Sequence, residues 1–110
     1  MTPKPSCESA RLEALYRYDI LDTVSDPAFD DLARLASYIC RTPIAVISFV
    51  DAERQWFKSS VGLDQKEARR ERAFCAHTIL GTDCFIVGKA DADERFKDHP
   101  WVIGPLALRF

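Results

Sequence analysis

The sequence contains no apolar run that is long enough to span a membrane. The longest run, Ile44–Val50, has the length of a strand and includes Ser48, whereas a spanning helix needs about 20 apolar residues. The first nine residues also lack the apolar stretch of a secretion signal. We therefore expect a cytoplasmic protein that does not associate with membranes.

Glycine and cysteine are both scarce. The four glycines form no Gly-rich phosphate loop. The four cysteines include no pair at C-x-x-C spacing, and adding His77 and His99 produces no familiar zinc pattern. We therefore expect free thiols in a reducing compartment, and neither a disulfide framework nor a metal site. The cysteines are Cys7, Cys40, Cys75 and Cys84.

Positive charge is not concentrated anywhere along the chain. Fifteen Lys and Arg residues are interspersed with seventeen Asp and Glu residues, for a net charge of −2. The densest charged run, Lys66–Arg72, is short and is typical of a solvated connector. Because nucleic-acid binding needs a clustered basic face, we expect no nucleic-acid partner.

The first half of the chain has strong signals for two helices and a hairpin. Apolar residues at helical spacing predict a helix over residues 8–21, after a flexible lead of residues 1–7. Asp26 followed by proline predicts the start of a second helix, Pro27–Cys40. The apolar run Ile44–Val50 and the segment Gln55–Val61 then predict two strands of a hairpin, the first covered on both faces.

The second half has weaker signals. Residues 63–72 read as a polar connector, and residues 73–80 as a short helix. A third strand is predicted at Cys84–Val87, and a short helix is predicted to begin at Asp91 and to end at Pro100-Trp101. Residues 106–110 read as the start of a fourth strand. Helices that precede and separate antiparallel strands indicate the α+β class, with helices packed on one sheet.

Four short motifs stand out in the sequence: Phe29–Leu32, Arg54–Ser59, Phe74–His77 and Phe96–Pro100. Together with further segments given below, they resemble the GAF domain, as found in bacterial sensor histidine kinases and diguanylate cyclases. The resemblance covers residues 8–110 and implies an antiparallel sheet with helices on both sides. It also implies that the final strands and the C-terminal helix are missing, so a C-terminally truncated domain is expected. An excised fragment, a sheet completed by a partner and a poorly stable product all remain open. The matching segments are residues 13–15 and 20–23, Phe29–Leu32, Pro43–Ala45, Val50-Asp51, Arg54–Ser59, Phe74–His77 and Phe96–Pro100.

The resemblance also implies where a ligand would bind. Helices over residues 73–80 and 91–97 would roof a pocket, and we expect ligand contacts from Phe74, His77, Phe96 and Trp101. The resemblance does not name the ligand or cofactor. No catalytic residue is expected, because Cys75 and His77 lie about 200° apart on a helix and do not converge. The charged residues Asp51, Glu53 and Arg54 are interpreted as a solvated turn.

These observations predict a non-catalytic sensory or regulatory module of a bacterial cytoplasmic signalling protein. Such a module binds a small ligand, forms a dimer, or does both, and controls an output domain that can lie on another chain. The homodimer would form through helices 8–21 and 27–40 or through the exposed strand 44–50. One alternative is a pure dimerisation or protein-interaction module with an empty pocket. Another is an oxidoreductase that acts through Cys75 and Cys84.

Overall fold

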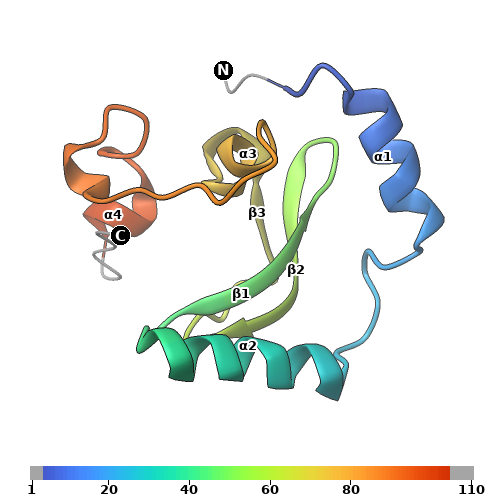
Figure 1. Ribbon diagram of the computed structural model, residues 1–110, viewed down its shortest axis with the longest axis horizontal. Helices are drawn as coiled ribbons and strands as arrows, with labels where there is room; N and C mark the ends of the chain where they lie inside the picture. The colour runs from blue at the N-terminus through green and yellow to red at the C-terminus, as the bar shows by residue number, and fades with distance from the viewer. Residues whose placement is uncertain (1–3, 105–110) are drawn as a thin grey trace.

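The computed structural model describes residues 4–104, without the side chain of Arg72. This part of the chain is an α+β structure with one three-stranded antiparallel sheet, in the order β1-β2-β3, and four α-helices. Figure 1 shows α2 on one face of the sheet and α3 and α4 on the other. The helices are α1 (Glu8–Arg17), α2 (Pro27–Cys40), α3 (Cys75–Thr78) and α4 (Pro100–Ile103). The strands are β1 (Ala45–Val50), β2 (Arg54–Val61) and β3 (Glu67–Arg69), and the 3-10 turns are η1 (Arg70–Arg72) and η2 (Ala90–Ala92).

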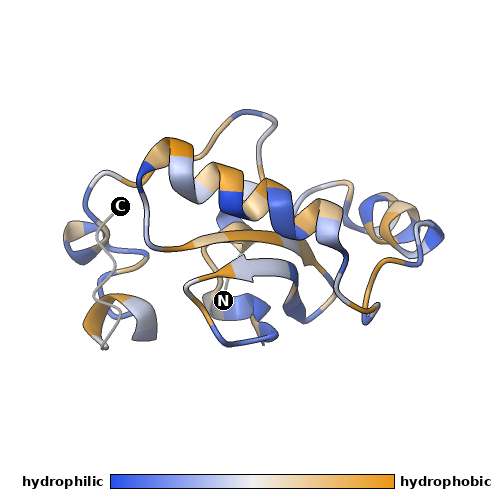
Figure 2. Ribbon diagram, turned by 90° about the horizontal axis from the view of Figure 1, so that it is seen from below, coloured by the Kyte–Doolittle hydropathy of each residue, from blue (hydrophilic) through white to orange (hydrophobic). Residues whose placement is uncertain are grey.

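Helix α2 has the predicted bounds, and its start has the predicted cause. The Asp26 carboxylate accepts a hydrogen bond from the Ala28 N–H at 2.9 Å, and Pro27 occupies the first turn. The helix ends where Arg41 adopts a left-handed conformation with φ 53°. Its sheet-facing side buries Ala33, but part of its apolar surface points away from the sheet (Figure 2). The exposed apolar residues of α2 include Leu32, Leu35, Tyr38 and Ile39.

Helix α1 is shorter than the predicted helix over residues 8–21. It ends at Arg17, because the chain turns at Asp19 and Asp22, which both have positive φ angles of 49° and 62°. Leu15 is the buried residue of α1. The helix lies beside the turn between β1 and β2, where Arg11 donates a hydrogen bond to the Val50 carbonyl.

The predicted hairpin is confirmed, and β2 is its central strand. β2 pairs with β1 on one side and with β3 on the other, and residues 55–59 are all buried. Within the part of the chain that the structure describes, β1 has a neighbour on one side only, so it is an edge strand. Most of β1 is only half-buried, so its predicted coverage on both faces is incomplete.

The segment 63–72 is not merely the connector that its polarity suggested. Phe57 donates its backbone N–H to the Lys66 carbonyl at 2.9 Å, and β3 pairs with the start of β2. The alternation of exposed and half-buried positions in β3 is hard to recognise in the sequence, because charged residues flank the half-buried Ala68. Charged side chains are common on edge strands, where they discourage pairing with other chains.

The predicted strand Cys84–Val87 is wrong. These residues have no strand pairing, and Phe85 and Val87 instead pack against a small core. That core contains Ala90, Phe96 and Val102, with Phe74 at its border. The four-residue apolar run therefore reflects packing against neighbouring side chains and not a place in the sheet.

The predicted helix from Asp91 to Pro100-Trp101 is also wrong. The chain forms the short turn η2 and further turns, and Pro100 begins the helix α4 instead of ending one. Proline suits the first turn of a helix, where its missing N–H has no partner to lose. α3 is one turn long and shorter than the predicted helix over 73–80. The strand predicted at 106–110 lies outside the described residues.

Gly62 allows β2 to leave the hairpin beside Pro43. Its φ is 75°, and a β-carbon at this position would lie 2.0 Å from the Pro43 carbonyl oxygen. A Gly62→Ala substitution should therefore lower the free energy of unfolding by more than about 1 kcal/mol. Urea denaturation of the variant measures this change. Gly88→Ala is the matched control, because a β-carbon at Gly88 has no neighbour within 4 Å; equal losses in both variants would contradict the steric argument.

Candidate functional site

The four residues that were predicted to contact a ligand lie close together. The rings of Phe74 and Phe96 stack with centroids 4.3 Å apart, and the edge of the His77 ring meets Phe96 at 5.0 Å. Phe74 also stacks with Trp101 at 6.4 Å. Whether they contact a ligand stays a prediction. We call the group formed by these four residues with Phe85 and His99 the aromatic cluster.

Phe85 and His99 were not among the predicted contacts. The ring of Phe85 meets Phe96 at 6.1 Å, and the ring of His99 lies 4.6 Å from that of Phe74. Phe85 was placed in a strand that does not form, and His99 was considered only as a possible zinc ligand and as part of a matching segment. Their position depends on how residues 84–99 fold back onto α3, for which the sequence pattern has no local signal.

Local capping connects the aromatic cluster to the sheet. The Nδ1 atom of His99 accepts a hydrogen bond from the Trp101 N–H at 3.0 Å and so caps α4. This holds Trp101 where its ring lies 6.2 Å from the ring of Phe57 on β2. The cluster therefore contacts the central strand of the sheet directly.

Burial within the aromatic cluster, with a smaller effect of Arg95, favours a neutral His77. Burial lowers the pKa of His77, and the nearby Arg95 guanidinium lowers it further against the opposing effect of Asp93. The guanidinium lies 4.9 Å from the Phe85 ring centroid and is bound by Asp93. Hydrogen bonds from Arg95 lower the pKa of Asp93 to about 2. A neutral imidazole both donates and accepts hydrogen bonds, so the cluster offers aromatic faces and one such polar group.

Cys75 and His77 face different surroundings, as their helical spacing predicts. The Cys75 sulfur accepts a hydrogen bond from Gln55 Nε2 at 3.1 Å and lies 3.8 Å from Ser48 Oγ, so it faces the sheet. His77 instead faces the aromatic cluster. Cys84, the other residue of the oxidoreductase alternative, is exposed. Among residues 4–104, no group of three or more His, Cys, Asp and Glu side chains is placed to hold a metal ion.

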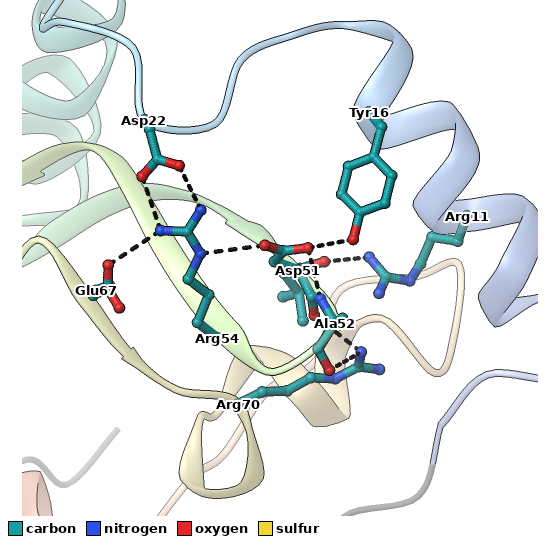
Figure 3. A network of polar contacts seen from close by, with 9 residues as sticks. Arg11, Tyr16, Asp22, Asp51, Ala52, Arg54, Glu67 and Arg70 are labelled. Atoms are coloured by element: carbon teal, nitrogen blue, oxygen red, sulfur yellow. Dashed lines mark hydrogen bonds and ion pairs between the residues drawn. The ribbon is translucent and has the colours of Figure 1, made fainter.

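The turn between β1 and β2 carries a polar network, and its charges are not merely solvated as predicted. The Asp51 carboxylate accepts hydrogen bonds from the Tyr16 hydroxyl at 2.7 Å and from Arg54 Nε at 3.2 Å. The other nitrogens of Arg54 donate to both oxygens of Asp22, at 2.9 and 2.7 Å, and one of them to Glu67. Figure 3 shows Arg54 lying between these three carboxylates.

Arg70 forms the second half of the network. Its buried guanidinium donates to both oxygens of Glu8 and to the backbone carbonyls of Asp51 and Ala52. Glu8 also binds Arg11. The network thus joins α1, the segment after α1 and β3 to one turn. Sequence reasoning missed it because its members lie up to 62 positions apart, and only the surplus of charge near the turn hinted at it.

No helix in the described residues is both long and apolar enough to cross a membrane.

The ion pair between Glu8 and Arg70 predicts how stability depends on pH. Hydrogen bonds from Arg70 and then from Arg11 lower the pKa of Glu8 from 4.5 to about 2. A group whose pKa is lowered by folding stabilises the fold above its unfolded pKa, and this contribution is lost as the pH falls toward the folded pKa. Glu8→Gln should therefore cost about 2 kcal/mol of unfolding free energy at pH 7. Between about pH 5 and pH 2 the difference from the wild type should shrink.

The measurement is urea denaturation of the wild type and the variant at several pH values. Glu13→Gln is the matched control, because Glu13 lies on the same helix and forms no ion pair among the described residues. It should leave stability nearly unchanged at every pH. A loss that is equal for both variants, or independent of pH for Glu8→Gln, would contradict the assigned role of Glu8.

The chain is similar over nearly its whole length to part of a larger bacterial protein. It is 39% identical over 108 residues to a protein of Pseudomonas aeruginosa that is named as a cyclic di-GMP phosphodiesterase. The match covers 98% of this chain but only 18% of that protein. The chain therefore spans less than a fifth of the length of its relative. No protein-family model matches the chain.

Proposed function

We propose that the chain is a non-catalytic sensory or regulatory module of the GAF type, from a bacterial cytoplasmic signalling protein. The observation that carries the proposal is the two-sided arrangement around β2. On one side the aromatic cluster contacts Phe57 through Trp101. On the other side α2 packs on β1 and β2 and presents exposed apolar side chains outward. A change on one side can thus reach the other through a single buried strand.

The relative supports a regulatory role in cyclic di-GMP signalling. That protein is named as a phosphodiesterase, and the part similar to this chain is only 18% of its length. Most of the length of that protein therefore lies outside the similar part and is available for the phosphodiesterase activity that its name states. A small module that shares a protein with such an activity is well suited to control it.

The mechanism that we propose is a shift between two packing states. A ligand that binds at the aromatic cluster favours one arrangement of Trp101 on Phe57, and β2 passes the change to α2. Because such coupling is reciprocal, an event at α2 changes the affinity for the ligand by the same factor. The output domain lies elsewhere in a longer protein or on another chain.

The proposed partner at α2 is a second copy of this chain. The outward surface of α2 combines Leu35, which is 52% exposed, with Leu32 and Ile39, which are also exposed. Two such helices can pack against each other about a two-fold axis, so that each copy buries the same apolar residues of the other. The edge strand β1 and helix α1 are the other surfaces through which a dimer could form.

One observation favours a second candidate, a pure interaction module without a ligand. Phe96 is only 1% exposed, and its ring stacks on Phe74 at 4.3 Å. The aromatic side chains thus fill part of the space between them. In this case dimerisation through α2 is the whole function.

Native mass spectrometry of the purified chain, without added ligand, tests both candidates. We expect a dimer of twice 12.5 kDa, and a discrete extra mass on it identifies a sensor. An empty dimer favours the pure interaction module. A bare monomer at every concentration contradicts both.

Paired substitutions locate the dimer interface in the same measurement. Leu35→Glu places a charge in the apolar surface of α2 and should weaken the dimer about tenfold or more. Ile86→Glu is the matched control, because Ile86 is 83% exposed but lies outside α2. The control should remain a dimer. Equal effects of the two substitutions would exclude α2 as the interface.

A further inference from the structure

A polar groove lies between β2 and the start of α2, and Phe57, which contacts Trp101 of the aromatic cluster, is among the residues that line it. Its volume is about 600 Å³. Its walls are formed by the segment 22–25 before α2, Asp30 in the first turn of α2, residues 56–60 of β2 and the loop 63–66. Its size suits a small metabolite, because ligand pockets typically begin near 300 Å³.

A β-bulge directs two neighbouring side chains of β2 toward this groove. Ile47 pairs with Ser59 and Ser48 pairs with Phe57, so Lys58 is an extra residue in β2. Neighbouring strand residues normally point to opposite faces, and a bulge changes this alternation. Accordingly Ser59 Oγ donates to the Asp30 carboxylate of α2 at 2.6 Å, and Lys58 Nζ donates to Thr23 of the adjoining segment at 2.8 Å.

The ammonium of Lys58 is buried without a carboxylate partner. Lys58 is 7% exposed, and its ammonium donates to the Thr23 hydroxyl and to the Val24 carbonyl. Within residues 4–104 no carboxylate forms an ion pair with it. The ammonium also lies 5.6 Å from the ring centroid of Phe29 and 6.0 Å from that of Trp56. An ammonium has three N–H donors, so the two hydrogen bonds leave one without an oxygen partner. A buried charge without a counter-charge is costly, and a bound carboxylate would remove that cost.

The other charges of the groove restrict the ligand further. Asp22 is bound by Arg54 through both of its oxygens. Asp30, Asp64 and Lys66 also line the groove, and one carboxylate oxygen of Asp30 accepts the hydrogen bond from Ser59. Two positive and two negative groups favour a ligand that carries both signs and has no net charge. A phosphate dianion would face the two carboxylates with no second buried cation.

We propose that this groove binds a zwitterion of the amino-acid class, with its carboxylate on Lys58 and its ammonium toward Asp30 and Asp64. The site is separate from the aromatic cluster and does not depend on a ligand there. A purely structural Lys58 that only fastens the segment before α2 to the sheet is the competing explanation, and it predicts no binding.

Tryptophan fluorescence gives a direct readout, because Trp56 lines the groove and the chain has two tryptophans. In a Trp101→Phe background Trp56 is the remaining fluorophore. We expect titration with L-glutamine to change its emission with a Kd of about 1 mM or tighter. Acetate, which lacks the ammonium, and inorganic phosphate should bind at least about tenfold more weakly.

Two substitutions divide the roles within the groove. Lys58→Met keeps the length of the side chain without its charge and should weaken glutamine binding about tenfold or more. Asp64→Asn should weaken glutamine binding but leave acetate binding unchanged. Lys97→Met is the matched control, because Lys97 is exposed and lies outside the groove. Circular dichroism of each variant checks that it is folded.

The outcomes separate the explanations. No emission change with any probe in the Trp101→Phe protein that carries no further substitution overturns the site, whatever the fate of the other variants. Tighter binding of phosphate than of glutamine overturns the amino-acid class. If Lys58→Met does not fold, two titrations still test the site: that of the protein without a substitution in the groove, and that of Asp64→Asn, which replaces an exposed residue. Glutamine binding that neither Lys58→Met nor Asp64→Asn weakens would place the ligand elsewhere.

Discussion

The structure depends above all on the burial of β2 on both of its faces. Residues 55–59 of this strand are all buried, although they include Gln55, Lys58 and Ser59. Each polar side chain has a hydrogen-bond partner on another element: Cys75, Thr23 and Asp30 respectively. Because a buried polar group without a partner costs free energy, α3, the segment before α2 and α2 itself must keep their places for β2 to remain buried.

The two halves of the molecule are held to β2 by different forces. The aromatic cluster is held by contacts between its rings, and Phe96 is its most buried member. Helix α1 buries little besides Leu15 and is held mainly by the network around Arg54 and Arg70. Ion pairs at exposed positions contribute little, but the Arg70 guanidinium is 5% exposed, so breaking its pair with Glu8 leaves a buried charge. The N-terminal segment is therefore the part of the fold that responds most to pH and salt.

Elements with strong local signals could be predicted, and elements that depend on distant contacts could not. The cap at Asp26 and the helical period indicated α2, and the apolar run Ile44–Val50 followed by a charged turn and a second strand segment indicated the hairpin. β3 and the loop residues Phe85 and Val87 take their conformations from what they pack against, which their sequence does not reveal. The candidate site follows the same division. The resemblance to GAF domains indicated four members of the aromatic cluster. The groove at Lys58 depends on a bulge in β2, and no turn residue in the sequence of β2 predicts that bulge.

We infer that β2 is the shared and most stable element of the fold. Native-state amide hydrogen exchange, followed residue by residue, tests it most directly, because exchange free energies rank the elements by local stability. We predict that the amides of Trp56–Ser59 exchange most slowly and only through global unfolding. We also predict that α1 and residues 84–99 exchange faster. Amides of β2 that exchange as fast as those of α1 would contradict the account, because the two sides of the sheet would then not share a common buried strand.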